Sequence, residues 1–177
     1  MQHENLWAPW RLAYLRRLKD REQAAGPPDE TSVNFLVTYW RHPEDDEANH
    51  VIHRDASGMI LLNRYPYSNG HLLVALGEPR PSVMDYDAAQ RTAFWKLVET
   101  AMELVNRLLE PQGINMGINL GSAAGAGLPE HVHAHVIPRW GGDTNFMTTV
   151  GDLRVAPASL EDMASLYREA IRATTDR

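Results

Sequence analysis

Three histidines stand at alternate positions in the segment HVHAHVI, as His131, His133 and His135. In an extended strand, side chains at alternate positions share one face, so we expect the three imidazoles to line one face that looks onto a cleft. The apolar residues between them should point the other way, into a core. Imidazole can act as a nucleophile, an acid–base group or a metal ligand near neutral pH, so this face is typical of a reactive site.

Three interpretations of this face compete. It is a solvated polar strand face, for which three histidines are a poor generic choice; it is a metal site, since imidazoles at alternate strand positions are good zinc ligands; or it performs nucleophilic and acid–base chemistry on a phosphate. The flanking residues favour the third. The glycine-rich run GSAAGAG, Gly121–Gly127, can bring backbone N–H groups close to phosphate oxygens, and His71 begins an apolar strand directly after Gly70.

The composition excludes several classes of protein. The chain has 177 residues, of which 44% are hydrophobic and 23% charged, and this suits one folded domain. It has no cysteine, which excludes disulfides, thiol nucleophiles and cysteine-based zinc sites. Its formal charge of −6 argues against broad binding of nucleic acid or an anionic membrane, although not against one local anion site. No apolar run approaches the ~18 residues of a membrane span and we find no signal peptide, so we expect a cytoplasmic protein.

The remaining elements follow from hydrophobic periodicity and turn residues. A helix over 7–23 precedes the loop AGPPDE, and a short helix carrying Phe35, Leu36 and Trp40 follows, capped by Thr31 or Ser32. A long helix begins at Asp85 or Asp87 and runs through Leu109, and a last helix covers about 160–173. Five strands are predicted, over 50–55, 59–63, 71–76, 114–120 and 131–138. The pattern predicts an α+β fold, a mainly antiparallel five-stranded sheet with helices packed on it.

These motifs resemble a known family. HVHAHVI matches the His-x-His-x-His-x-x signature of the histidine-triad (HIT) family, and ILLNRYPYSNGHLLV resembles the upstream strand pair of that family. NLGSAAGAGLPEHVHAHVIPRWGGDTNFM is similar to the branch of diadenosine tetraphosphate phosphorylases and hydrolases, and WAPWRLAYL resembles the N-terminal extension of that branch. The resemblance covers most of the chain, from Trp7 to Met147.

The resemblance implies a fold, an activity and a partner. It implies an N-terminal helical extension over 1–30, a HIT domain over 31–150, and a C-terminal helix within 151–177 that belongs to the same domain. It implies a homodimer whose sheet continues across the interface. The implied substrates are dinucleoside polyphosphates, with adenine nucleotides favoured and no cofactor. Cleavage would proceed by hydrolysis or phosphorolysis, through a covalent nucleotidyl-histidine intermediate.

The resemblance also implies roles for single residues. His133 would attack the α-phosphorus, His135 and His71 would hold or protonate the phosphate oxygens, and His131 would orient the array by bonding to backbone. Asn63 would contact the ribose. The residues that would border the polyphosphate or the second nucleotide are Asn119, Gly125, Ala126, Gly127 and Trp140.

The sequence departs from the family in two places. Many bacterial relatives carry a zinc-binding Cys-x-x-Cys pair where this chain has Asn34-Phe35-Leu36-Val37, so we expect no metal there, and whether His50 and His53 bind one stays open. Relatives often carry a hydroxyl residue where this chain has Ala126-Gly127, which leaves open whether water or phosphate is the acceptor. Three other functions remain: a nucleotide-binding protein of low turnover, a nucleoside phosphoramidate hydrolase or uridylyltransferase-like enzyme, and a metal-dependent enzyme that uses the three histidines as ligands.

Overall fold

The structure, a computed structural model, describes residues 34–143 and 157–175. All of them belong to one of two compact units, Asn34–Arg177. The helix expected over 7–23 lies outside the described residues, as do both boundaries of the expected domain division. That division therefore stays a prediction.

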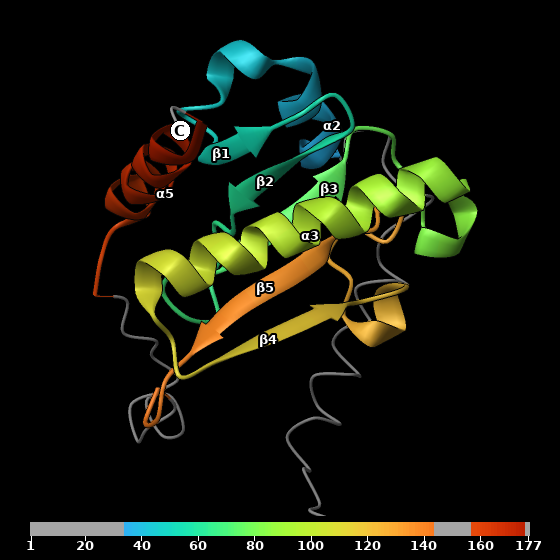
Figure 1. Ribbon diagram of the computed structural model, residues 1–177. Coiled ribbons are helices and arrows are strands. Elements are labelled where there is room, and N and C mark those ends of the chain that lie inside the picture. Colours follow the sequence, from blue (N-terminus) through green and yellow to red (C-terminus); the bar gives the residue numbers. More distant parts are fainter. Residues whose placement is uncertain (1–33, 144–156, 176–177) are drawn as a thin grey trace, which may run out of the picture. The chain divides into compact units, whose positions relative to one another are not determined.

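Five antiparallel strands form one sheet in the order β1-β2-β3-β5-β4 (Figure 1). This confirms the predicted α+β fold with a five-stranded sheet. The first three strands follow one another as a meander, and the chain then crosses over through α3 to reach the far edge at β4. The strands are β1 Val51–Arg54, β2 Gly58–Leu62, β3 Leu72–Leu76, β4 Gly113–Ile118 and β5 Ala134–Arg139.

The long helix α3, Ala88–Leu109, begins with a capping box in which the Asp87 carboxylate accepts the backbone N–H of Gln90 and the Gln90 amide oxygen accepts that of Asp87. The short helix α2, Phe35–Arg41, is capped by Asn34, so the expected cap at Thr31 or Ser32 was wrong. The other helices of the described residues are α5, Leu160–Thr175, and three 3-10 turns, η1 Pro43–Asp45, η2 Val83–Asp85 and η3 Ser122–Ala124. None of the described helices has the length and apolar character needed to cross a membrane.

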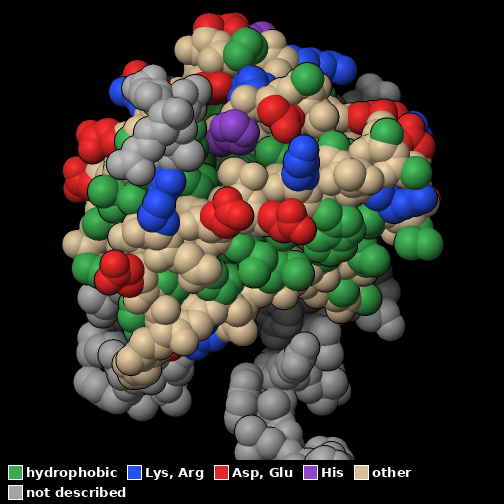
Figure 2. Space-filling model, viewed as in Figure 1, with side chains coloured by type: hydrophobic (Ala, Val, Ile, Leu, Met, Phe, Trp, Pro, Cys, Tyr) green, Lys and Arg blue, Asp and Glu red, His purple; other side chains and the backbone are tan. Residues whose placement is uncertain are grey.

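Each face of the sheet buries its own hydrophobic cluster. Helices α3 and α5 pack on one face, and their cluster includes Val132, Ala134 and Val136, which confirms the predicted inward direction of these residues. Helix α2 packs on the other face, where Leu36 contacts a second cluster that includes Leu61 and Leu73. The outer surface over α3 carries acidic and basic side chains intermixed (Figure 2). Because Val132, Ala134 and Val136 alternate with the triad histidines and face α3 and α5, the triad histidines lie on the α2 side of the sheet.

Strand β5 begins at Ala134 and not at 131, so His131 and His133 precede the strand and do not lie within it. The register of β3 with β5 pairs Val74 with Ala134, and its continuation would place Leu76 opposite Val132. The Val132 N–H donates instead to the carbonyl of Arg80, at 2.7 Å. Residues 131–133 thus lie outside the strand, and the Val132 N–H bonds to a loop carbonyl and not to β3.

The link between β2 and β3 brings Asn63 beside His71. The backbone N–H of Asn63 donates to the His71 carbonyl at 2.9 Å, which closes the loop. Gly70 has a φ of +81°, and an added Cβ would meet Leu109 and Tyr167, so glycine is required for both its conformation and its space. His71 thereby enters β3 in a fixed direction.

A test of this packing is the substitution Gly77→Ala. A Cβ at Gly77 would overlap the indole of Trp40 and force α2 away from the sheet. We expect the substitution to lower the free energy of unfolding by about 1–3 kcal/mol, as overpacking does. Gly113→Ala, whose Cβ would meet nothing within 4 Å, is the control and should change it little. Urea unfolding followed by circular dichroism measures both; equal stabilities would contradict the contact.

Candidate active site

A cavity of about 480 Å³ opens on the α2 face of the sheet. Two of the three triad histidines, His133 and His135, are on its wall. Its described lining residues come from α2, from the segments around β1 and β2, from β3, and from the glycine-rich loop. They are Phe35, Tyr39, Ala48, Asn49, His50, Leu61, Leu62, Asn63, Arg64, Tyr65, Tyr67, Leu73, Gly125, Gly127, Leu128, His133 and His135.

His133 is held in one tautomer by the backbone of its own segment. Its Nδ1 lies 2.9 Å from the carbonyl oxygen of His131, and a carbonyl only accepts, so Nδ1 carries the proton. The lone pair is then on Nε2. The side chain is 7% exposed and lines the cavity, so this nitrogen is the group available to an electrophile.

His71 and His135 form a directed hydrogen-bond chain. The backbone N–H of Tyr67 donates to His71 Nδ1 at 3.1 Å, and the Asn63 amide nitrogen lies 3.3 Å from the same atom. Nδ1 of His71 is therefore an acceptor, and the proton is on Nε2, which lies 3.0 Å from Nδ1 of His135. By the same logic the proton of a neutral His135 is on Nε2. His135 therefore presents a donor, whereas His133 presents a lone pair.

His71 lies deeper than His133 and His135. We expected it to hold or protonate the phosphate oxygens; in the structure it is fully buried, does not line the described cavity, and places its Nε2 3.0 Å from Nδ1 of His135. The ring of Tyr67 covers the pair, stacked on His135 with 5.9 Å between centroids and 12° between planes, and tilted on His71 at 4.9 Å.

His131 is fully buried and turned away from the other rings. Its Nε2 donates to the carbonyl of Leu76 at 2.8 Å, and its Nδ1 lies 3.3 Å from the side-chain oxygen of Asn34. The bond to the Leu76 backbone is a contact of the kind that the resemblance implied, and the orienting role of His131 stays a prediction. By the resemblance, Asn34 and Val37 take the places of the zinc-binding cysteines of relatives. Neither an amide that caps α2 nor a valine suits zinc, so these residues do not fit that metal.

Burial sets the charge state of two of these rings. It lowers the pKa of His135 to about 4, and repulsion from His133 acts in the same direction. Burial also lowers the pKa of His131, against the hydrogen bond to Leu76. Both rings are therefore neutral at pH 7, and for His135 this agrees with the tautomer that its partner imposes.

The glycine-rich loop borders the cavity at Gly125 and Gly127. The N–H of Gly125 donates to Ser122 and that of Ala126 donates to Gly121, so both are used inside the loop. The N–H of Gly127 has no hydrogen-bond partner among residues 34–143 and 157–175. One donor of this loop is thus available to an anion in the cavity.

The structure separates the other expected binding residues. Asn63, Gly125 and Gly127 line the cavity, whereas the described lining lacks the remaining three: Asn119, Ala126 and Trp140. Asn119 follows β4 opposite His133 in the register, and Trp140 follows the far end of β5 from the triad. The contacts of these three residues with substrate stay a prediction.

Sequence reasoning missed the apolar wall and the mouth of the cavity. Phe35 and Tyr39, four residues apart on α2, line the wall, and their helical spacing is the signal that points to a shared face. Arg64, Tyr65 and Tyr67 come from the turn after β2, where two tyrosines flank a proline. His50, left open as a metal ligand, also lines the cavity and has a φ of +54°.

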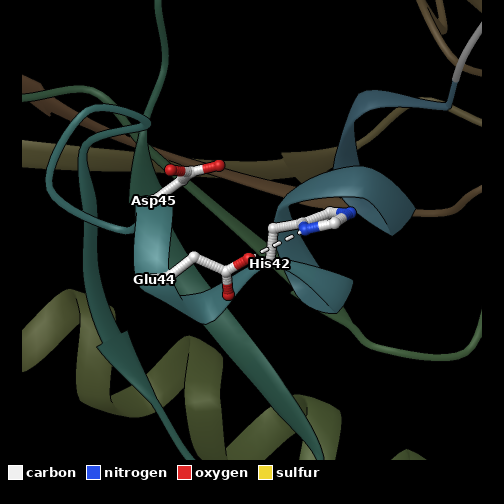
Figure 3. Close-up of side chains that lie close together, drawn as sticks. All are labelled: His42, Glu44 and Asp45. Carbon is white, nitrogen blue, oxygen red and sulfur yellow. Dashed lines mark hydrogen bonds and ion pairs between the residues drawn. The ribbon is translucent and has the colours of Figure 1, made fainter.

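A second cluster of ligand-type residues lies outside the cavity. Figure 3 shows His42, Glu44 and Asp45, which are the one such group of three whose ligand atoms lie within 4.8 Å of one another in the described part of the chain. All three are exposed, and His42 and Glu44 already bond to each other at 3.0 Å. His53 lies in a separate groove between α3 and the neighbouring elements. Neither feature contacts the triad.

Comparisons with known proteins identify the family of the chain. The HIT domain model matches residues 44–142. An AP-4-A phosphorylase from Mycobacterium tuberculosis is 34% identical over 169 residues, which cover 93% of this chain and 83% of that protein. A bis(5'-nucleosyl)-tetraphosphatase (asymmetrical) from Schizosaccharomyces pombe is 29% identical over 89 residues, which cover 50% of this chain and 48% of that protein.

Solved structures show the same fold. A hypothetical histidine triad nucleotide-binding protein from Sulfolobus tokodaii matches with a TM-score of 0.63 at 22% identity, over 78% of this chain and 93% of that chain. The domain model covers more than half of the chain, and the mycobacterial relative matches nearly all of it. The chain, with His133 and His135 on the wall of its cavity, belongs to the HIT family.

Proposed function

We propose that this protein cleaves dinucleoside polyphosphates of the diadenosine tetraphosphate type, with His133 as the nucleophile. The observation that carries the proposal is the fixed tautomer of His133, which directs a lone pair into the cavity beside a neutral donor, His135. The names of the two relatives, a phosphorylase and a tetraphosphatase of such compounds, support the substrate class.

In the first step Nε2 of His133 attacks the α-phosphorus. A P–N bond forms, the P–O bond to the next phosphate breaks, and the electron pair leaves with the departing nucleotide. The Nδ1 proton stays on the ring, hydrogen-bonded to the His131 carbonyl, so the positive charge of the nucleotidyl-histidine is stabilised there. Water or phosphate then attacks the phosphorus and releases His133.

The neutral state of His135 favours a polyphosphate over a phosphoramidate as substrate. A neutral imidazole with a pKa of about 4 donates a hydrogen bond from Nε2 but has no second proton to give away. ATP is a stable anion and leaves without being protonated, whereas an amine leaving group needs a proton. The Gly127 N–H is a second donor that supports charge on the phosphate oxygens.

The apolar part of the cavity suits the nucleoside that remains on the enzyme. Phe35 and Tyr39 of α2 face the sheet residues Leu61 and Leu73, and a planar base fits between apolar surfaces of this kind. Asn63 also lines the cavity, and it bonds to His71, so it is suited to contact the ribose.

The open edge of the sheet supports a homodimer. At the β1 edge, Arg168 of α5 donates to the Val51 carbonyl at 3.1 Å, whereas within the described residues β4 pairs with β5 alone. Met116 in β4 is 44% exposed. An unpaired edge with exposed apolar side chains is suited to pairing with a second copy. The proposed dimer therefore joins two β4 strands.

Product analysis of diadenosine tetraphosphate, with and without added phosphate, tests the activity. Hydrolysis gives AMP and ATP, and phosphorolysis gives ADP and ATP. We expect His133→Asn to abolish turnover, because no lone pair then reaches the phosphorus, and to leave binding of AMP nearly unchanged. His53→Asn, outside the cavity, is the matched control. Turnover within about tenfold of wild type in His133→Asn would remove its nucleophilic role.

The titration of His135 is a second test. Its pKa of about 4 lies below the ordinary 6.5, so the ring should stay neutral from pH 8 to pH 5 with Nε2 protonated. As pH falls, His135 binds its second proton in the unfolded chain before it does so in the folded chain. The free energy of unfolding should therefore decrease through this ring from pH 6.5 down to about pH 4. Nitrogen-15 NMR of labelled histidine reports both tautomer and titration. A midpoint near 6.5 for His135 would contradict the buried donor.

The proposed interface predicts the effect of a charge on β4. Met116→Glu would place like charges opposite each other across a β4–β4 pairing, and we expect the dissociation constant of the dimer to rise at least about tenfold. Met84→Glu, 79% exposed on η2, is the control for added charge. Light scattering after gel filtration measures the mass. A monomeric wild type, or a dimer unaffected by Met116→Glu, would refute this interface.

A further inference from the structure

The turn after β2 places Arg64 and Tyr65 at the open end of the cavity. Both line it, and Tyr65 is 80% exposed, whereas Leu61 and Leu73 on the apolar wall are at most 4% exposed. A substrate whose base occupies the apolar wall and whose α-phosphate meets His133 has to extend from the cavity into solvent. Ala48, Gly125 and Gly127 are also exposed lining residues, but among the exposed borders that the described residues form, this turn is the one that carries a cationic and an aromatic side chain.

The charged side chains that line the cavity favour the binding of an anion. Its described lining contains no aspartate or glutamate, and Arg64 is the one lysine or arginine there. Arg54, Arg80 and Arg139 each pair with a carboxylate, whereas Arg64 makes no ion pair within residues 34–143 and 157–175. An arginine without a carboxylate partner, next to a cavity without acidic groups, is a good binding partner for phosphate.

Hydrogen bonds of Asn63, which lines the cavity, fix the backbone of this turn. The Asn63 side-chain oxygen accepts the N–H of Tyr65 at 3.0 Å, and the Asn63 N–H donates to the His71 carbonyl at 2.9 Å. Arg64 thus stands between the residue proposed for the ribose and an exposed aromatic ring. Such a hydrogen-bonded turn reduces the conformational entropy that a ligand would have to freeze.

We infer that Arg64 and Tyr65 form a subsite for the part of the substrate that leaves: Arg64 binds the phosphates beyond the attacked phosphorus, and Tyr65 stacks on the second base. The inference rests on the proposed function and adds the residues that select dinucleoside polyphosphates over mononucleotides. Both contacts act on the distal half of the substrate, so they affect AMP little.

Equilibrium binding tests this subsite without turnover. In a His133→Asn background, calorimetry compares AMP, adenosine tetraphosphate and diadenosine tetraphosphate. We expect Arg64→Gln to weaken adenosine tetraphosphate about tenfold and AMP less than about twofold, and the tetraphosphate loss to shrink as salt is raised. Arg41→Gln, which removes an exposed arginine of α2 outside the cavity, should leave all three affinities unchanged.

Tyr65 is tested by comparing the two tetraphosphates. Tyr65→Ala should weaken diadenosine tetraphosphate about tenfold but adenosine tetraphosphate little, because only the former has a second base to stack, and Tyr65→Phe should retain the affinity. Equal losses for AMP and both tetraphosphates, or no loss, would overturn the subsite. A wild type that binds these ligands in the expected order but turns none over would count against the proposed function and leave the subsite standing.

Discussion

The chemistry of this site depends on the backbone carbonyl of His131, which takes no part in the hydrogen bonding of the sheet. Strand β5 lies between β3 and β4, and over Ala134–Val136 it pairs with both neighbours. Because the strand begins only at Ala134, the His131 carbonyl is available to accept the Nδ1 proton of His133. Had the ladder continued to His131, this acceptor would have been occupied and the imidazole would have been free to take either tautomer.

The buried histidines also depend on which hydrogen-bond partners are available to them. Burying an imidazole without hydrogen bonds is costly, and within the described residues no buried side-chain nitrogen or oxygen lacks a partner. Each bond that satisfies a ring also selects its tautomer: Leu76 does so for His131, and Tyr67 does so for His71. The hydrogen bonds that the buried rings need for stability are therefore the same bonds that orient the reactive groups.

The sequence predicted the fold well and the site in part, for physical reasons. Hydrophobic period shows which residues share a face, and it placed Val132, Ala134 and Val136 correctly in the core. It does not show where a ladder ends, because that depends on a distant partner, the Arg80 carbonyl. The glycine-rich composition of the loop identified a border of the cavity, but which N–H remains available follows only from the hydrogen bonds within the loop.

The direction of His71 could not be read from its neighbours in the sequence either, because its burial results from rings that the fold brings together. The ring of Tyr67 packs on it with 4.9 Å between centroids, and its Nε2 lies 3.0 Å from Nδ1 of His135, a residue far away in the sequence. A pattern of apolar and polar residues does not show such contacts.

The acidic net charge of the chain does not oppose an anionic substrate. The charge of −6 is a sum over the chain, whereas a ligand responds to the groups within about a Debye length, ~8 Å at physiological salt. Several carboxylates that contribute to the sum are paired with arginines, as Asp46 is with Arg54 and Asp143 with Arg139. None lines the cavity in the described part of the chain. The donors around the attacked phosphate are neutral, so they bind the polyanion without a fixed positive charge that would retain the product. Binding strength can then come from the distal phosphates. These leave with the departing nucleotide.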